Sequence, residues 1–252
     1  MVACDPPGTA PAAPPVKAPD APQSPVRREL RDWLDMLRTG GAMAERKIAM
    51  ERLARLDRAA LLKGRATLAE ALSDKDPVVR MTAAGLAMKL GADGHTLAPG
   101  LTALLDDKDA YITVSAARSL LIIGAARGPA VEALFRVAAS STDSRLRDLT
   151  ARTLYGLDGH DPAVVAVVKA RLADTDPQLC GLALRVAGGF GEHAAPLRPA
   201  IQDLAAHPNA FVARLAEESL RRLRGEPIES TPPRGPSPAG PPAPIKGSGS
   251  DD

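Results

Sequence analysis

Apolar and small residues recur at helical spacing in a string that returns along the chain. After Asp76 they stand three, seven, eleven and fourteen positions on, at Val79, Ala83, Ala87 and Leu90. The same offsets after Asp109 fall on Ile112, Ala116, Leu120 and Ile123. Residues spaced in this way lie on one face of an α-helix. The pattern therefore predicts similar helices, each buried along one stripe.

The residue before each such helix recurs at a nearly constant interval. An aspartate or asparagine, here called a cap residue, stands 33 or 34 residues after the previous one: Asp76, Asp109, Asp143, Asp176 and Asn209. Because Asp and Asn side chains accept hydrogen bonds from the first free backbone amides of a helix, each cap residue predicts a helix start. The predicted ends of three of these helices are glycines: Gly91, Gly124 and Gly191. A constant period of this length is typical of a stacked repeat array.

A second helical segment precedes each cap residue. Apolar residues at helical spacing fill the ranges 61–73, 97–107, 129–140, 162–174 and 196–207. Ahead of them, residues 27–38 and 42–57 form a more charged pair, as expected at the end of a stack where one face meets solvent. We predict an all-α protein, an α-solenoid of about six stacked helix pairs.

Proline divides the chain into three parts. Residues 1–25 and residues 226–252 hold eight prolines each, and the 200 residues between them hold eight in total. Segments so rich in proline and poor in large apolar residues cannot bury enough surface to offset the loss of chain entropy. We therefore predict a disordered Pro/Ala-rich tail at 1–25, a folded solenoid at 26–225 and a disordered Pro/Gly/Ser-rich tail at 226–252.

The string DKDPVVRMTAAGLAMKLG, residues 74–91, resembles the second helix of a HEAT repeat, particularly the bacterial type shared with phycobilisome-lyase-like proteins. The resemblance extends over residues 26–225. It implies a solenoid whose second helices line the inner, concave surface, and it is compatible with many unrelated partners.

One position departs from the HEAT pattern. An arginine usually follows Asp-Pro-x-Val and bonds to an aspartate of the neighbouring repeat. Arg80 and Arg147 keep this arginine, and Arg46 in the terminal pair is a further candidate for it. Three other second helices carry different residues there: Thr113, Cys180 and Ala213. We expect the Asp–Arg ladder between repeats to be incomplete.

Composition offers little support for catalysis. Aromatic residues make up 2% of the chain and the formal net charge is +2, so no overall field favours nucleic acid. His95, His160 and His193 lie in turns between repeats, and helix packing distances of about 10 Å predict that adjacent histidines are too far apart to share a metal. Cys180 is predicted to be a buried structural thiol. No CxxC or GxSxG motif occurs. We predict no enzymatic activity, no cofactor and no metal.

The remaining candidate site is an arginine row on the second helices. Arg118, Arg152 and Arg185 each stand nine residues after a cap residue, off the buried stripe. Tyr111 and Arg145 stand two residues after their cap residues, on the same flank. Such a row suits an acidic peptide, a phosphate or a carboxylate-bearing partner. The alternative is a solvated flank, in which Arg152 pairs with Asp148.

Three functions of different classes stay open. The first is a non-enzymatic scaffold, a monomer that binds a protein or acidic peptide through its inner face. The second is an accessory subunit that assists an enzyme, as in bilin attachment. The third is a weak nucleic-acid binder that uses the arginine row, and the near-neutral charge disfavours it.

The start of the chain offers a different kind of candidate. MVAC followed by a Pro/Ala-rich segment resembles the end of a bacterial lipoprotein signal, in which the cysteine is lipidated. No apolar stretch precedes Cys4, so either the start has been trimmed or Cys4 is a plain thiol on a tail. The first alternative predicts a cell-envelope protein attached to the membrane only by its lipid. The second predicts a cytoplasmic one.

Partition between detergent and aqueous phases distinguishes the two alternatives for Cys4. A lipidated protein isolated from its native cell enters the detergent phase, because acyl chains dominate its partition. Cys4→Ser should then move it to the aqueous phase. A native protein that stays aqueous with Met1 still attached contradicts the lipoprotein interpretation.

Overall fold

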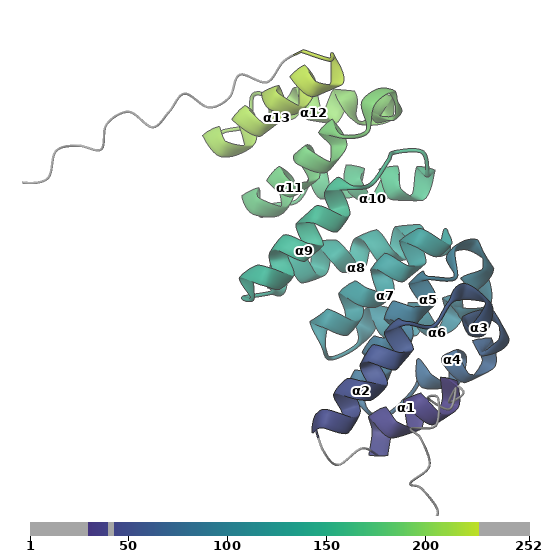
Figure 1. The fold of residues 1–252 in the computed structure, drawn as a ribbon. Helices are drawn as coiled ribbons and strands as arrows, with labels where there is room; N and C mark the ends of the chain where they lie inside the picture. The colour runs from purple at the N-terminus through teal and green to yellow at the C-terminus, as the bar shows by residue number, and fades with distance from the viewer. Residues whose placement is uncertain (1–29, 40–42, 227–252) are drawn as a thin grey trace, which may run out of the picture.

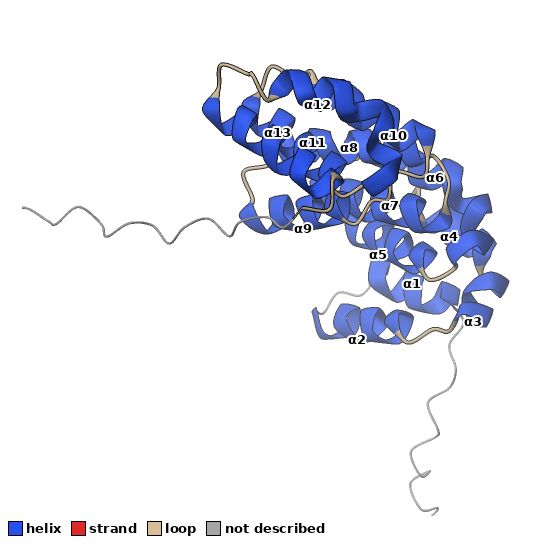
Figure 2. Ribbon diagram, turned by 90° about the horizontal axis from the view of Figure 1, so that it is seen from above, coloured by secondary structure: helices blue, strands red, loops and turns tan. Residues whose placement is uncertain are grey.

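The computed structural model describes residues 30–39 and 43–226, and within them every regular element is a helix (Figures 1 and 2). The described helices form six successive pairs. The first helices of the pairs are α1 (Leu30–Thr39), α3 (Arg58–Lys63) continued by α4 (Arg65–Ala71), α6 (Ala98–Ala103), α8 (Arg127–Ser140), α10 (Pro162–Leu172) and α12 (Arg198–Leu204). The second helices are α2 (Met43–Ala54), α5 (Pro77–Met88), α7 (Ala110–Ile123), α9 (Ser144–Tyr155), α11 (Pro177–Gly188) and α13 (Ala210–Leu223). The predicted all-α solenoid is confirmed.

The pairs stack side by side into a curved array (Figure 1). Figure 2, the view from above, shows α3, α4, α6 and α10 along the outer edge of the arc and α2, α5 and α9 along the inner edge. One continuous core runs between the two layers, from α1 to α13. Leucine and alanine dominate this core, and the fully buried Phe135 is its largest side chain. The second helices therefore face the hollow of the arc.

The cap residues begin the second helices as predicted. In each case the side-chain oxygen accepts a hydrogen bond from the backbone N–H two residues on: Val78, Tyr111, Arg145, Gln178 and Phe211. Gly124 ends α7 in a left-handed conformation, with φ of 79°. Gly91 and Gly191 also have positive φ, but they lie two residues past the caps of α5 and α11 and open short 3-10 segments, η1 (Gly91–Leu97) and η3 (Gly191–Leu197).

Two of the predicted first helices are less regular than expected. The range 61–73 is divided at Gly64, which ends α3 and begins α4. A Cβ at Gly64 would lie 2.4 Å from Leu30 Cδ2, so the glycine allows α1 to approach closely. In the range 97–107, α6 lies between η1 and a second 3-10 turn, η2 (Leu104–Asp106). Gly100 weakens α-helical propensity there, and Pro99 stands in the first turn of α6, where proline is tolerated.

Hydrogen bonds connect consecutive repeats near the starts of the second helices. Arg46 Nη2 donates to the cap residue Asp76 at 2.7 Å. Arg80 then donates twice to Asp107, at 2.7 and 3.1 Å. Arg147 reaches only the Ser141 carbonyl, within its own repeat. The predicted incomplete ladder is confirmed: in the described chain it runs along the N-terminal repeats and no arginine continues it beyond α9.

Serine hydroxyls bring two pairs of second helices into close contact. Ser119 Oγ of α7 lies 2.7 Å from the Ala84 carbonyl oxygen of α5. Ser219 Oγ of α13 lies 2.7 Å from the Leu184 carbonyl oxygen of α11. Both serines follow their cap residues by ten positions. The equivalent residue of α9, Thr153, bonds to the Leu149 carbonyl of its own helix instead.

Helix α9 is accordingly the least tightly held of the later second helices. It buries only Leu146, Thr150 and Leu154. Packing of α5 on α7, and of α11 on α13, is more extensive than packing of α9 on either neighbour. The fourth pair is therefore held in the stack mainly through its first helix, α8, which packs extensively on α7.

The Arg80–Asp107 pair should contribute measurably to stability, because the Asp107 side chain is 6% exposed and the Arg80 side chain 18% exposed. Arg80→Ala leaves this carboxylate without its partner, and we expect the free energy of unfolding to fall by about 2 kcal/mol. Arg147→Ala removes the equivalent arginine from an exposed position and should cost less than about 1 kcal/mol. Urea unfolding of the full chain measures both. Equal losses of unfolding free energy in the two variants would show that the Arg80–Asp107 pair stabilises the fold no more than an exposed arginine does.

The same pair predicts a pH dependence. Burial raises the pKa of Asp107, but hydrogen bonds from Arg80 and from the backbone N–H of Asp109 outweigh burial and hold this pKa below its ordinary value. The contribution of the pair to stability is therefore fully present at a pH above the pKa of an aspartate in the unfolded chain, about 4. It is lost as the pH falls through the lower pKa of Asp107 in the folded chain. The stability difference between wild type and Arg80→Ala should shrink over that acidic range.

Candidate binding surface

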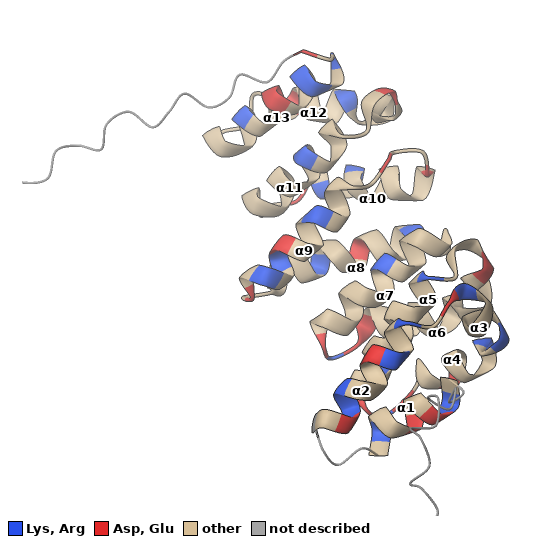
Figure 3. Ribbon diagram, viewed as in Figure 1, with Lys and Arg blue, Asp and Glu red and all other residues tan. Residues whose placement is uncertain are grey.

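The inner surface formed by α7, α9 and α11 carries an excess of positive charge. These three helices contain five arginines, Arg118, Arg145, Arg147, Arg152 and Arg185, and one acidic residue, Asp148. Figure 3 shows these basic segments on neighbouring helices. The cap residues Asp109, Asp143 and Asp176 at the starts of these helices accept hydrogen bonds there and keep their negative charge. With them included, five arginines face four aspartates, so the net charge of this surface is only slightly positive.

The three members of the arginine row differ in their surroundings. Arg118 is half-buried and Arg185 is exposed, and neither forms a hydrogen bond or ion pair within the described residues. Arg152 is exposed and pairs with Asp148 at 2.5 Å. All three lie on consecutive second helices, outside the buried stripe. Their role in binding stays a prediction.

Tyr111 and Arg145 have different surroundings, although each stands two residues after a cap residue. The Tyr111 hydroxyl donates to Asp143 Oδ2 at 2.6 Å, so it connects α7 to the cap residue of α9. Sequence reasoning missed this contact, in which a tyrosine hydroxyl bonds to an aspartate of the next repeat, as the arginines of the ladder do. Arg145 is exposed and its guanidinium has no ion pair within the described residues.

Several arginines on the first helices are paired, although Arg65 and Arg198 are not. Arg58 pairs with Asp93 and Arg171 with Glu132, while Arg136 lies 2.8 Å from Asp106 and Arg127 3.4 Å from Asp158. These pairs join neighbouring repeats or turns on the outer side. Paired guanidinium groups already have their charge balanced, so they attract an anionic partner less than unpaired ones do.

Two exposed apolar side chains accompany the arginine row. Ile122 is 53% exposed and follows Arg118 by four residues, one helical turn. Tyr155 is 43% exposed and follows Arg152 by three residues. Sequence reasoning missed both, although Ile122 lies outside the buried stripe of α7 and is recognisable for that reason. The surface offers apolar contacts next to its charges.

The histidines contradict one expectation. Adjacent turn histidines were predicted to lie too far apart to share a metal, yet the rings of His160 and His193 are 3.9 Å apart between centroids. The prediction used the distance between helix axes, and the side chains of two turns span that distance. Among the residues described by the structure, no group of three or more His, Cys, Asp or Glu side chains is placed to hold a metal.

Cys180 is buried, and its Sγ lies 3.3 Å from the Leu172 carbonyl oxygen. Burial raises the pKa of this thiol, and the charge of Asp174 raises it further. The protonated thiol is a poor nucleophile, so its structural assignment stands. Cys4 lies outside the described residues. No helix in the described ranges is both long and apolar enough to span a membrane.

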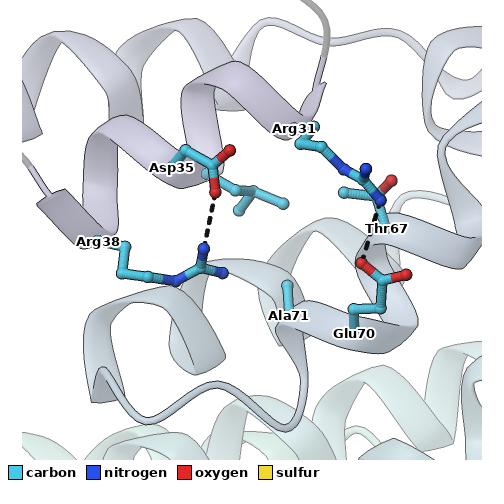
Figure 4. Close-up of a pocket in the computed structure, with 7 residues that line it drawn as sticks. Arg31, Asp35, Arg38, Thr67, Glu70 and Ala71 are labelled. Atoms are coloured by element: carbon cyan, nitrogen blue, oxygen red, sulfur yellow. Dashed lines mark hydrogen bonds and ion pairs between the residues drawn. The ribbon is translucent and has the colours of Figure 1, made fainter.

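A charged cleft of about 310 Å³ lies between α1 and α4 (Figure 4). Arg31 pairs with Glu70 at 3.3 Å, and Arg38 pairs with Asp35 at 2.7 Å. Arg38 also donates to Asp74 at 2.8 Å. Because both arginines are balanced by carboxylates, this cleft is better explained as the contact that holds the terminal helix pair on the stack.

Comparisons with known proteins give structural similarities only. No family model matches the sequence, and no curated protein matches it. An engineered protein is 21% identical, with a TM-score of 0.42, and the match covers 78% of this chain and 96% of that one.

Two natural proteins are also similar in structure. The archaeal HEAT-like repeats protein from Thermococcus onnurineus NA1 is 16% identical, with a TM-score of 0.42, covering 78% of this chain and 87% of that one. The complex of CpcE and CpcF of phycocyanin lyase from Nostoc sp. PCC7120 is 22% identical, with a TM-score of 0.34, and the match covers 86% of this chain and 71% of that one.

The Tyr111–Asp143 contact can be tested by titration. The hydrogen bond to Asp143 raises the pKa of the Tyr111 phenol above its ordinary value. In a Tyr155→Phe variant Tyr111 is the single tyrosine, and its phenolate absorbance should appear with a midpoint above about 10. Asp143→Asn should lower that midpoint, since it removes the carboxylate charge. An unchanged midpoint would show that the two side chains do not interact in solution.

Proposed function

We propose that this chain is a non-enzymatic repeat scaffold that binds an acidic segment of a protein partner on the inner surface formed by α7, α9 and α11. The observation that carries the proposal is that Arg118, Arg145 and Arg185, on three consecutive second helices, have no ionic partner within the described residues. Exposed apolar side chains lie beside them, Ile122 on α7 and Tyr155 on α9.

The chemistry of arginine supports an acidic partner. A guanidinium group presents a planar set of donors that matches a carboxylate or phosphate in two parallel hydrogen bonds. Unpaired arginines spread over consecutive repeats suit an extended ligand that crosses several helices. Ile122 and Tyr155 add exposed apolar area beside these charges, which favours a polypeptide with apolar side chains over a simple anion.

The surface is a weaker match for nucleic acid. Single-stranded nucleic acids bind on stacking platforms of several aromatic side chains, and Tyr155 is the one exposed aromatic residue described on the C-terminal part of these three helices. Tyr111 at the start of α7 is already engaged with Asp143. A protein partner therefore fits the composition of the surface better. Where that partner is an enzyme, the scaffold has the accessory role that the sequence left open.

The experiment compares two matched double variants of the full chain in affinity purification from the native cell lysate. Arg118→Glu/Arg185→Glu reverses two unpaired arginines on the inner surface. Arg65→Glu/Arg198→Glu reverses two exposed, unpaired arginines at the starts of α4 and α12, with the same change in net charge. We expect the first variant to lose the partner and the second to retain it. Each inner arginine should contribute about 2 kcal/mol if it is desolvated in the interface.

Three results would contradict the proposal. Equal loss in both variants would indicate a diffuse charge effect, and retention in both would place the partner on another surface. Recovery of nucleic acid whose affinity falls steeply with salt would favour nucleic-acid binding instead. Circular dichroism should show the same helicity in all three proteins, because none of the four arginines has an ion pair within the described chain.

A further inference from the structure

The turn after the fourth helix pair packs directly on the turn after the fifth. Gly159 lies in the first turn, and a Cβ at this position would be 2.7 Å from Phe190 Cγ. Phe190 is 3% exposed and immediately precedes Gly191, whose φ of 56° turns the chain into η3. The missing side chain of Gly159 therefore lets one turn rest on the ring of the other.

This contact brings two histidines together from different repeats. His160 directly follows Gly159, and His193 stands in the first turn of η3. Their ring centroids are 3.9 Å apart with an angle of 42° between the planes. The His160 side chain is 69% exposed and the His193 side chain 35% exposed, so both rings are accessible from solvent.

Carboxylates stand beside both rings. Asp158 Oδ2 lies 3.5 Å from His160 Nδ1, and Glu192 Oε1 lies 3.9 Å from His193 Nε2. At these distances the two carboxylates favour a cation near the rings through their charge rather than through a hydrogen bond to the ring nitrogens. Asp158 also lies 3.4 Å from Arg127, which holds it near the turn.

We propose that His160 and His193 form a two-histidine site for a divalent transition-metal ion such as Zn²⁺, connecting the turns after the fourth and fifth helix pairs. Imidazole nitrogen is a preferred ligand of Zn²⁺, with Zn–N bonds of about 2 Å. Two imidazoles on one tetrahedral zinc have ring centres about 5 Å apart. The rings thus need to separate by about 1 Å and to turn until one nitrogen of each points at the ion, which the exposed His160 permits.

The site is an open one. No third ligand is already in place among the described residues, so water completes the coordination. The exposed Glu192 is able to join, whereas Asp158 already pairs with Arg127. Open coordination with two protein ligands gives exchangeable binding rather than a permanent structural metal. Its effect would be local: the ion would fix the two turns that flank α11, next to the loosely held α9.

Calorimetric titration with ZnCl₂ tests the site in the untagged full-length chain. All proteins carry Cys4→Ser, because a cysteine thiolate also binds zinc. We expect one zinc per chain, and we expect His160→Ala and His193→Ala each to weaken binding at least about tenfold. The double variant should bind no more weakly than the weaker single variant, since either substitution removes the two-ligand site.

His95→Ala is the matched control. His95 occupies η1, the counterpart of η3 three repeats earlier, and no second histidine ring contacts it. This variant should bind zinc like the wild type, and zinc should raise its melting temperature by the same amount. The proposal is overturned if wild type binds no zinc, or if His95→Ala weakens binding as much as the two paired substitutions.

A second variant tests the geometry rather than the ligands. Gly159→Ala keeps both histidines but places a Cβ against Phe190, so the turns must separate. Zinc affinity should fall while circular dichroism stays helical. Unchanged affinity in this variant would show that the close approach of the turns does not create the site. Neither outcome depends on the arginine row, so failure of this proposal leaves the proposed function intact.

Discussion

Each helix pair in this chain leaves one face that only the next pair can bury, and the rest of the structure follows from this constraint. Aromatic residues are too few to fill wide gaps, so neighbouring helices approach closely through small side chains. Ala83 and Ala116 are fully buried, and Ser119 bonds across to the neighbouring helix. Where such contacts are lacking, as around α9, neighbouring second helices pack less extensively.

The same constraint explains why the fold was predictable from the sequence. Every second helix has to be started and buried in the same way, so the cap residues and the apolar positions that follow them recur along the sequence. These signals are local, because an aspartate caps the helix that begins next to it. First helices gave weaker signals, and the division at Gly64 depends on Leu30, which lies far away in sequence.

Contacts between repeats were largely hidden from the sequence. The incomplete ladder was foreseen, but the bond from Tyr111 to Asp143 replaces an arginine by a residue of different chemistry at a different offset. The meeting of His160 and His193 depends on how a glycine in one turn fits a phenylalanine in another, and no period reveals that fit. The arginine row had a visible pattern. Which of its members are already paired depends on side-chain geometry and required the structure.

Helix α9 gives the inner layer an uneven density of contacts. Helix α5 packs extensively on α7, and α11 on α13, while α9 packs less on both neighbouring second helices. The fourth pair is held instead through its first helix, α8, which packs on α7 as extensively as α5 does. Because α9 buries few side chains, we expect it to open locally more readily than its neighbours. It lies on the inner edge of the arc, so the part of the hollow that it lines is the part whose shape a bound ligand alters with the fewest broken contacts (Figure 2).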